Sequence, residues 1–240
     1  MDNALHYLAL NRQIGLKFEM DVIANNIANL DTTGFRREGV SFTEFVLAAA
    51  NENSVSMADS GARHIVERPG AVSETGGIFD MAIEGDGFFL LETNEGPVLT
   101  RAGSFQISND GILTTPTGAP VLDVGGAQIP IPLEAKNISV ASDGTISAGG
   151  DALAQVAVVT AEQVDLQRFG NTAFQVVNDN FQPVVNPQVR QGALEASNVD
   201  AIQEIARMIE VTRAYEMAQS VIEDEDERVR QSIQTLGENV

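Results

Sequence analysis

The sequence contains no cysteine and no tryptophan, and its basic residues are few. Without cysteine the chain can form neither disulfides nor thiolate metal sites, and it has no thiol nucleophile. Lys and Arg together number 14 against 34 Asp and Glu, which gives a formal net charge of −20. A surface of this charge repels nucleic-acid phosphates unless basic residues gather in a patch, and no such cluster occurs. We therefore expect no nucleic-acid partner.

Long apolar runs are also missing, because no stretch approaches the roughly 20 apolar residues of a membrane-spanning helix. We therefore expect no membrane span. The N-terminus carries Asp2 and no basic leader, which does not fit a cleaved signal peptide. At 240 residues and 43% hydrophobic composition, the chain can nevertheless bury a sizeable core.

Catalytic and metal-binding patterns are absent from the sequence as well. The only histidines are His6 and His64, and no nucleophile elbow, phosphate loop or zinc-binding helix motif occurs. Asn109-Asp110-Gly111 and Asp143-Gly144 lack the alternating oxygen ligands of a calcium loop and are better explained as turns. We expect no enzyme activity, no cofactor, no metal site and no small-molecule substrate.

Proline and glycine are confined largely to the middle of the chain. All eight prolines lie between Pro69 and Pro187, so the two ends are free to be helical. In the middle, short apolar runs alternate with turn signals such as Asp86-Gly87, which is typical of hairpins in an antiparallel β domain. The predicted strands are Phe79–Ile83, Phe88–Leu91, Val98–Thr100, Ser104–Ile107, Ile112–Thr114, Ile138–Val140 and Leu153–Thr160.

The N-terminal segment has a narrow apolar stripe at helical spacing. Its members follow one another at steps of four and three residues, the spacing of a coiled-coil seam. They are Leu16, Met20, Ile23, Ile27 and Leu30. Asp31–Gly34 ends the helix, and Gly34 suits the left-handed conformation just past a last turn.

Three asparagines, Asn25, Asn26 and Asn29, interrupt this helix although asparagine has a poor helix propensity. They have two interpretations of similar weight. They are either exposed polar positions that the helix tolerates, or amides that tie the helix to neighbouring backbones and fix its register.

The C-terminal segment predicts the longest helix, because neither glycine nor proline occurs from Val199 to Leu236. Ser197 or Asn198 can cap it. Its seam comprises Val211, Tyr215, Ala218, Ile222, Val229 and Leu236, and its apolar face widens near the start at Ile202, Ile205, Met208 and Ile209. The acidic run Glu223–Glu227 spreads around the helix and predicts a solvated or partner-facing band rather than a metal site.

Each terminal helix thus has an apolar stripe that would remain partly exposed to solvent if the two helices paired only within one chain. Burying a Leu, Ile or Val side chain is worth roughly 1.5–3 kcal/mol, which favours association with neighbouring copies. The predicted fold class is α+β, with long terminal helices forming a coiled-coil-like pair around a central antiparallel all-β domain. The predicted parts are residues 1–35 (N-terminal helix), 36–75 (extended connector), 76–190 (β domain) and 191–240 (C-terminal helix).

Both ends of the chain carry a recognisable signature. Residues 24–36, Ala-Asn-Asn-Ile-Ala-Asn-Leu-Asp-Thr-Thr-Gly-Phe-Arg, resemble the N-terminal signature of bacterial flagellar basal-body rod and hook proteins. Residues 192–200, Gly-Ala-Leu-Glu-Ala-Ser-Asn-Val-Asp, with Thr212–Glu216, are similar to the C-terminal signature of that family. The segments 85–90, 100–105 and 109–111 resemble its β domain. Among the members the chain looks most like the proximal-rod protein, with the distal-rod protein as the alternative.

The resemblance implies that the terminal helices pack into an inner tube while the β domain forms an outer layer. Partners would be other copies, neighbouring rod proteins including the distal-rod protein, and the flagellar export apparatus. Localisation would be the basal-body rod within the periplasm. The residues that the resemblance assigns to subunit packing are Asn25, Asn26, Asn29, Thr32, Gly34 and Phe35, and then Leu194, Glu195, Ser197, Asn198, Val199, Asp200, Arg213 and Tyr215.

A different class, a secreted β-rich binding module with helical arms, shares the acidity and the hairpins. It gives no reason for an apolar seam at both termini, and it predicts no association that depends on the ends.

Overall fold

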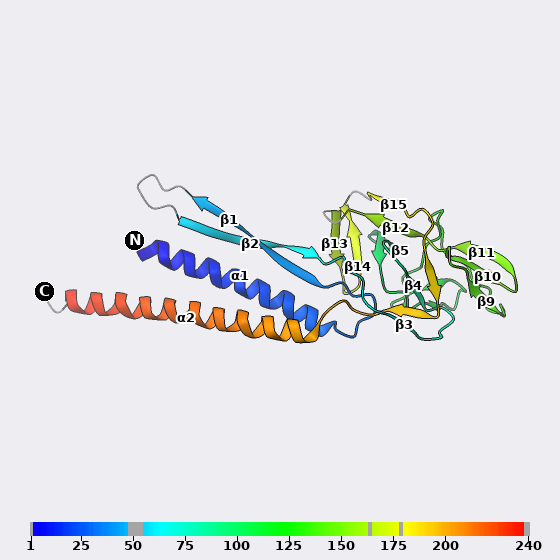
Figure 1. Ribbon diagram of the computed structural model, residues 1–240. Coiled ribbons are helices and arrows are strands. Elements are labelled where there is room, and N and C mark those ends of the chain that lie inside the picture. The colour runs from blue at the N-terminus through cyan, green and yellow to red at the C-terminus, as the bar shows by residue number, and fades with distance from the viewer. Residues whose placement is uncertain (1, 48–54, 163–164, 178–179, 238–240) are drawn as a thin grey trace. The chain divides into compact units, whose positions relative to one another are not determined.

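The computed structural model describes residues 2–47, 55–162, 165–177 and 180–237 (Figure 1). The chain forms two compact units. The helical unit comprises Met1–Ala28, Glu38–Ile65 and Asp200–Val240, and the β unit comprises Asn29–Arg37 and Val66–Val199. The chain therefore passes between the units after residues 28, 37, 65 and 199.

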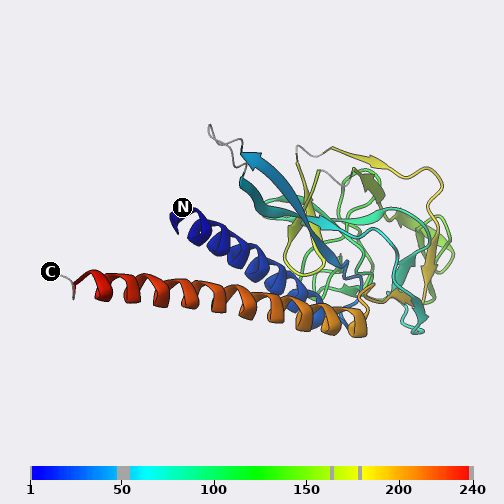
Figure 2. The ribbon, with the colours of Figure 1, turned by 60° about the vertical axis from the view of Figure 1, so that its left-hand side comes forward.

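The helical unit contains helices α1 (Asp2–Ala28) and α2 (Ala201–Gly237) and an antiparallel hairpin of β1 (Glu38–Leu47) and β2 (Val55–Ile65). The helices run antiparallel, and α1 lies between α2 and the hairpin in both ribbon views (Figures 1 and 2). The segment for which the sequence predicts an extended connector, residues 36–75, thus contains this hairpin as well as strand β3 (Val72–Glu74).

The prediction of a coiled-coil-like pair of helices was wrong. Of the predicted N-terminal stripe only Ile23 is fully buried, and Leu30 lies beyond the last residue of α1. The other buried positions of α1 include Glu19 and Asn26, so polar residues share its inner face. The reason is that α1 packs against the hairpin as well as against α2, which divides its surface between two neighbours. The fold is α+β, with two helices and antiparallel strands.

The start of α2 also differs from expectation. Asp200, not Ser197 or Asn198, caps the helix: its Oδ1 accepts hydrogen bonds from the amides of Ile202 (2.9 Å) and Gln203 (3.2 Å). An acidic residue in this position satisfies free amides of the first turn and suits the positive end of the helix dipole.

The β unit is antiparallel throughout its described strands. Its main sheet has six strands in the order β13-β14-β6-β5-β12-β15, and a three-stranded sheet has the order β11-β10-β9. Shorter pairs join β16 to β4, β17 to β3 and β7 to β8. The strands are β4 (Met81–Ile83), β5 (Phe88–Thr93), β6 (Gly96–Thr100), β7 (Gln106–Ile107), β8 (Leu113–Thr114), β9 (Ile138–Val140), β10 (Thr145–Ala148), β11 (Asp151–Gln155), β12 (Val158–Ala161), β13 (Leu166–Phe169), β14 (Ala173–Val176), β15 (Phe181–Pro183), β16 (Val189–Gln191) and β17 (Ala193–Glu195).

The apolar core of the β unit lies between these sheets and the loops that cross them. Phe89 packs edge-on against Phe105, with ring centroids 5.2 Å apart, and Phe88 packs likewise against Phe174 at 5.7 Å. The predicted strand Leu153–Thr160 is divided into β11 and β12, because β11 pairs with β10 whereas β12 pairs with β5 and β15 in the other sheet. The core residues are Met81, Ile83, Phe89, Leu91, Val98, Phe105, Leu113, Val121, Ile129, Ile131, Ile146, Val156, Val158 and Val189.

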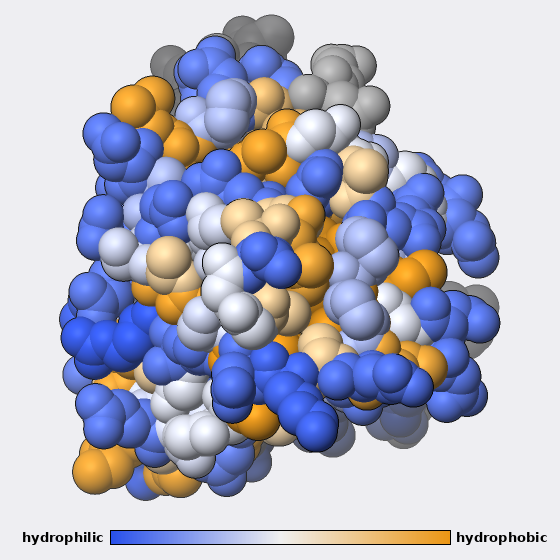
Figure 3. All heavy atoms as spheres, turned by 90° about the vertical axis from the view of Figure 1, so that its right-hand side faces the viewer, coloured by the Kyte–Doolittle hydropathy of each residue, from blue (hydrophilic) through white to orange (hydrophobic). Residues whose placement is uncertain are grey.

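The surface of the β unit mixes polar and apolar side chains, and the face in Figure 3 shows them interspersed. Large exposed apolar residues such as Val185 and Leu133 belong to loops. In the part of the chain that is described, no helix has the length and apolar character needed to cross a membrane.

Candidate assembly site

Many of the predicted packing residues fall into three groups in the structure, and the others are mostly half-buried. One gathers around Asn26 in the helical unit, a second gathers around Glu195 in the β unit, and a third lies exposed on α2. The first two groups form contacts within the chain, and the third faces solvent.

Asn26 links three elements of the helical unit and is fully buried. Its Nδ2 donates to the carbonyl oxygen of Glu38 (2.8 Å), and its Oδ1 accepts from the amide of Glu38 (3.0 Å). The same Nδ2 donates to Oε2 of Glu204 on α2 (3.1 Å). Of the two interpretations of the asparagines, the structure supports the register-fixing amide for Asn26, because one side chain ties α1 to the first residue of β1 and to α2.

Nearer the N-terminus of α1, further polar contacts join α1 to α2. Arg207 donates from Nε to Oε1 of Glu19 (2.7 Å), and Glu19 is nearly buried. This hydrogen bond raises the pKa of Arg207 above its ordinary value. The hydroxyl of Thr212 lies 3.8 Å from the sulfur of Met20, which is half-buried. These contacts fix how the two helices lie along each other.

Gly34 and Phe35 belong to the β unit and are both buried. Gly34 has φ +70°, as the sequence predicts, although it lies six positions beyond the end of α1 and not directly after its last turn. A Cβ at Gly34 would also collide with the backbone of Arg101 and Ala102, so no larger residue fits. The guanidinium of Arg168 stacks on the ring of Phe35 at 4.6 Å from its centroid.

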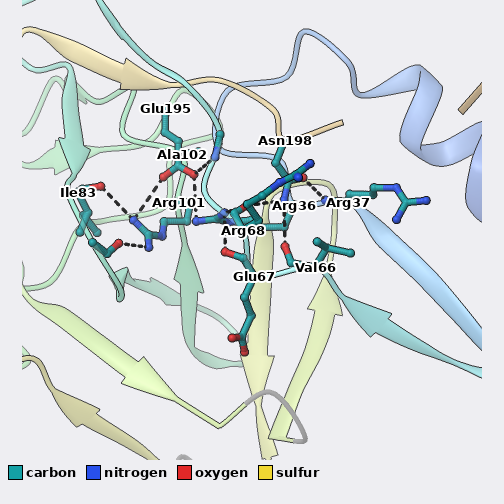
Figure 4. Close-up of polar contacts among 12 residues, drawn as sticks. Arg36, Arg37, Val66, Glu67, Arg68, Ile83, Arg101, Ala102, Glu195 and Asn198 are labelled. Carbon is teal, nitrogen blue, oxygen red and sulfur yellow. Dashed lines mark hydrogen bonds and ion pairs between the residues drawn. The ribbon is translucent and has the colours of Figure 1, made fainter. Parts of the chain in front are cut away.

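Glu195 binds two buried arginines, and we call Arg36, Arg101 and Glu195 the Glu195 cluster (Figure 4). Oε1 of Glu195 lies 2.9 Å from Nη2 of Arg36, and Oε2 lies 3.3 Å from Nη1 of Arg101. The pairing of β17 with β3 places Glu195 opposite Val72, and the amide of Gly70 donates to its Oε1 (2.9 Å).

The remaining donors of the two arginines reach backbone carbonyls. Arg36 donates to the carbonyl oxygens of Glu67 (2.9 Å) and Arg68, and Arg101 donates to those of Ile83 (3.1 Å) and Gly85 (2.5 Å). Burial lowers the pKa of Arg101 to about 10 and also lowers that of Arg36, while Glu195 opposes both shifts. Both side chains remain charged at neutral pH, so the cluster has one more positive than negative charge.

Asn198 joins the same region of the β unit. Its Oδ1 accepts from the amide of Arg37 (2.6 Å), and its Nδ2 donates to the carbonyls of Val66 (2.9 Å) and Arg68 (2.7 Å). With its amide committed to three backbone groups, Asn198 holds the chain that precedes α2 and is not available to cap that helix (Figure 4).

The other signature residues take simpler positions. Asn29 is buried and accepts a hydrogen bond from the hydroxyl of Thr32 (3.1 Å). The hydroxyl of Ser197 accepts from the amide of Val199 (3.3 Å). The half-buried members of the predicted set are Leu16, Met20, Asn25, Ile27, Leu30, Thr32, Leu194, Ser197, Val199, Tyr215 and Ile222.

The third group is exposed. Ile202, Ile205 and Ile209 have 81%, 50% and 49% of their surface accessible. Arg213 is exposed too. The acidic run Glu223–Glu227 lies at the surface except for half-buried Glu225, which pairs with Arg228 at 2.5 Å.

Four residues that matter in these clusters were not predicted: Arg36, Glu38, Arg101 and Glu204. All four are charged and yet at most 4% exposed. Arg36 and Arg101 stand within the segments that carry the family resemblance, which was the available signal. Glu38 and Glu204 carried none, because a buried acid is recognisable only once its partner is known. No group of three or more potential metal ligands occurs among the described residues.

Three stretches of the chain match family profiles. Residues 7–36 match "Flagella basal body rod protein", residues 82–148 match "Flagellar hook protein FlgE/F/G D1 domain", and residues 190–235 match "Flagellar basal body rod FlgEFG protein C-terminal". The first and last of these segments contain the predicted packing residues, and the second contains much of the β core. Fold and terminal signatures therefore define a protein of the flagellar rod and hook class.

Full-length comparison narrows this class. The chain is 40% identical to the flagellar basal-body rod protein FlgF of Caulobacter vibrioides, over 99% of each chain. It is 36% identical to FlgF of Rhizobium meliloti, over 96% of this chain and 97% of the relative, and 30% identical to FlgG of Bacillus subtilis, over 95% and 97%. The chain belongs to the flagellar basal-body rod protein family, which confirms the predicted resemblance.

Proposed function

We propose that this protein is a structural subunit of the flagellar basal-body rod and that the exposed sides of its terminal helices pack against neighbouring subunits. The family membership and the near-complete coverage of relatives named as rod proteins support a structural role. The greater identity to proteins named FlgF than to the FlgG of Bacillus subtilis supports a position in the proximal rod.

The observation that carries the packing proposal is the exposed side of α2. At 3.6 residues per turn, positions 202, 205 and 209 fall within about 60° of one another around the helix. Ile202 is 81% exposed, whereas Val211 and Glu204, which binds Asn26 of α1, are 2% and 1% exposed. Three isoleucines on one side of a helix therefore form an apolar strip that the helical unit itself does not cover.

Covering this strip is energetically favourable. Each isoleucine gains roughly 1.5–3 kcal/mol when it is fully buried, so three of them provide a substantial drive toward association. On α1, Leu10 and Ile14 are also about half exposed, at 49% and 52%. Two different exposed surfaces on one subunit permit heterologous contacts, which generate an open helical assembly when the rotation does not close.

In this proposal the partners are other copies and neighbouring rod proteins, including the distal-rod protein. The subunit lies in the basal body within the periplasm after delivery by the flagellar export apparatus. Its work is mechanical and not enzymatic: the assembled rod transmits torque and leaves a central channel.

The packing proposal is tested by replacing Ile202, Ile205 and Ile209 together with glutamine in cells that lack the native gene. We expect at least about tenfold less protein in isolated basal bodies and a loss of swimming, because the strip no longer buries apolar surface. A matched control replaces Val185 and Leu133, exposed apolar residues of the β unit, with glutamine. Normal incorporation of the triple variant, at wild-type protein levels, contradicts the proposal.

The proximal position has a separate test. Gold labelling of an epitope-tagged chain on isolated basal bodies should place it on the cytoplasmic-membrane side of the rod. A label on the outer-membrane side indicates a distal-rod subunit instead.

A further inference from the structure

The N-terminal and C-terminal signature segments meet inside the β unit. The amide of Gly34 donates to the carbonyl of Glu195 (2.8 Å), and the amide of Arg37 donates to Oδ1 of Asn198 (2.6 Å). On its other side, the carbonyl of Arg37 accepts from the amide of Val66 (2.9 Å). Residues 34–37 are therefore connected both to the segment after β2 and to the segment before α2.

The Glu195 cluster adds charge to this arrangement (Figure 4). One carboxylate is shared by two guanidiniums that are 2% and 4% exposed. If the carboxylate charge is removed, two buried positive charges lose their directly paired counterion and repel each other, and only the more distant carboxylates, such as Asp86, still act on them. Loss of the partner of a buried charge is strongly destabilising. The burial of the two arginines therefore depends on the charge of Glu195.

Residues 34–37 are held by one fully buried aromatic side chain and by polar contacts. Phe35 is the one large apolar side chain of this segment. It is buried, and the guanidinium of Arg168 stacks on its ring. Arg168 adds a polar contact, because its Nη2 donates to the carbonyl of Arg36 (2.6 Å). Besides the burial of Phe35, hydrogen bonds and ion pairs with partners distant in sequence therefore order the segment.

We propose that Glu195 and Asn198 form a reciprocal latch with residues 34–37: each segment is held in place only while the other is docked. The latch requires residues some 160 positions apart, so the N-terminal signature remains unpinned until the chain through residue 198 is present. Coupling of this kind is reciprocal, because the free energy by which one docked segment stabilises the other is the same in both directions. The inference concerns the isolated subunit and does not depend on the rod assignment.

The test is amide hydrogen exchange of the full-length monomer, resolved to single residues, in two variants. Glu195→Gln keeps the size of the side chain and removes its charge, and we expect the amides of Gly34, Arg37 and Val66 to exchange roughly a hundredfold faster. Arg36→Met should raise the exchange rates of the amides of Gly70, Ala196 and Asn198 to a similar degree. Amides of the β core, such as those of Leu90 and Leu99, should keep their protection in both variants.

Glu84→Gln is the matched control, because Glu84 pairs with Arg190 at the exposed surface of the same unit. It should leave all these amides unchanged. The latch is refuted if Glu195→Gln accelerates only the amide of Gly70, or if the β core loses protection to the same extent as residues 34–37. Should Glu195→Gln fail to fold, Asn198→Ala decides: protected amides at Arg37 and Val66 in that variant also refute the latch.

Discussion

The two units of this protein differ in the extent of their apolar cores, although both bury charged side chains. The β unit has a continuous core of aliphatic and aromatic residues, with Phe89 and Phe174 fully buried. In the described part of the helical unit, by contrast, buried positions include Glu19, Asn26 and Glu204, while Ile202 and other isoleucines lie outside. The β unit thus has the larger internal apolar core, whereas α2 of the helical unit leaves isoleucines exposed, and the packing proposal rests on that exposed surface.

Under the proposed function, this difference allows one subunit to fold stably and still have a surface for assembly. Hydrophobic burial provides most of the favourable free energy of folding, and the β unit obtains it internally. Polar contacts such as those of Asn26 contribute less net stability but specify geometry, because each donor has one suitable acceptor. The helical unit therefore has a defined arrangement while its apolar strip remains available.

The largest expected effect concerns the β core. Phe89→Ala should lower the free energy of unfolding of the β unit by about 3–5 kcal/mol, because it leaves a cavity in place of a buried ring. Urea denaturation followed by a probe in the β unit measures this change. Val185→Ala, at an 85% exposed position, should stay within about 0.5 kcal/mol of wild type. Equal losses in the two variants contradict the location of the core.

Gly34→Ala should rank next. A Cβ there meets the backbone of Arg101 and Ala102 at a positive φ, so the loop or its neighbour must shift, and we expect a loss of at least about 2 kcal/mol. Gly118→Ala provides the comparison: it also has a positive φ, but no atom lies within 4 Å of the added carbon. A similar loss in both variants shows that backbone conformation alone, without the close contact, explains Gly34.

Asn26→Ala tests the polar contacts of the helical unit. It removes the hydrogen bonds that Asn26 makes with the backbone of Glu38 and with the carboxylate of Glu204, and we expect about 1–3 kcal/mol less stability of this unit. Helical circular dichroism during thermal unfolding measures it. Gln13→Ala removes an exposed contact with Gln219 and should have almost no effect. An unchanged melting curve for Asn26→Ala removes the basis for a register-fixing role.

Single replacements in the exposed strip should change little in the monomer. Ile205→Ala is expected to stay within about 0.5 kcal/mol of wild type, apart from the small gain from alanine's helix propensity. Thermal unfolding of dilute protein provides the measurement. A loss of 2 kcal/mol or more shows that the strip is covered within the monomer and ends the contrast between the units.

The smallest expected effect is a pH dependence in the β unit. The amide of Thr145 donates to Oδ1 of Asp143 (2.9 Å), and this hydrogen bond holds the pKa of Asp143 below its ordinary value. Because the folded pKa is lowered, the stabilisation is complete above the ordinary pKa of about 4 and is lost as the pH falls through the folded value. Wild type should therefore exceed Asp143→Asn slightly in stability at pH 7 and match it in strong acid. A difference in stability between wild type and Asp143→Asn that persists below both the folded and the unfolded pKa of Asp143 contradicts this explanation.

Much of the fold was accessible from local patterns. The proline-free ends predicted both helices, and runs such as Phe88–Leu91 and Val98–Thr100 predicted strands that the structure contains as β5 and β6. Two failures have one cause. The coiled-coil pairing and the capping role of Asn198 both depended on which other segment comes near, and spacing along one segment does not contain that information.

The sequence by itself determined where helix and strand form, the absence of thiol and disulfide chemistry, and the family, because these follow from residue type, local spacing and signature. Only the tertiary structure decided that Asn26, Glu195 and Asn198 hold the chain together internally while Ile202, Ile205 and Ile209 face outward. The physical reason is that burial of a polar group requires a partner in space, and the partners of these residues lie 12 to 178 positions away along the chain.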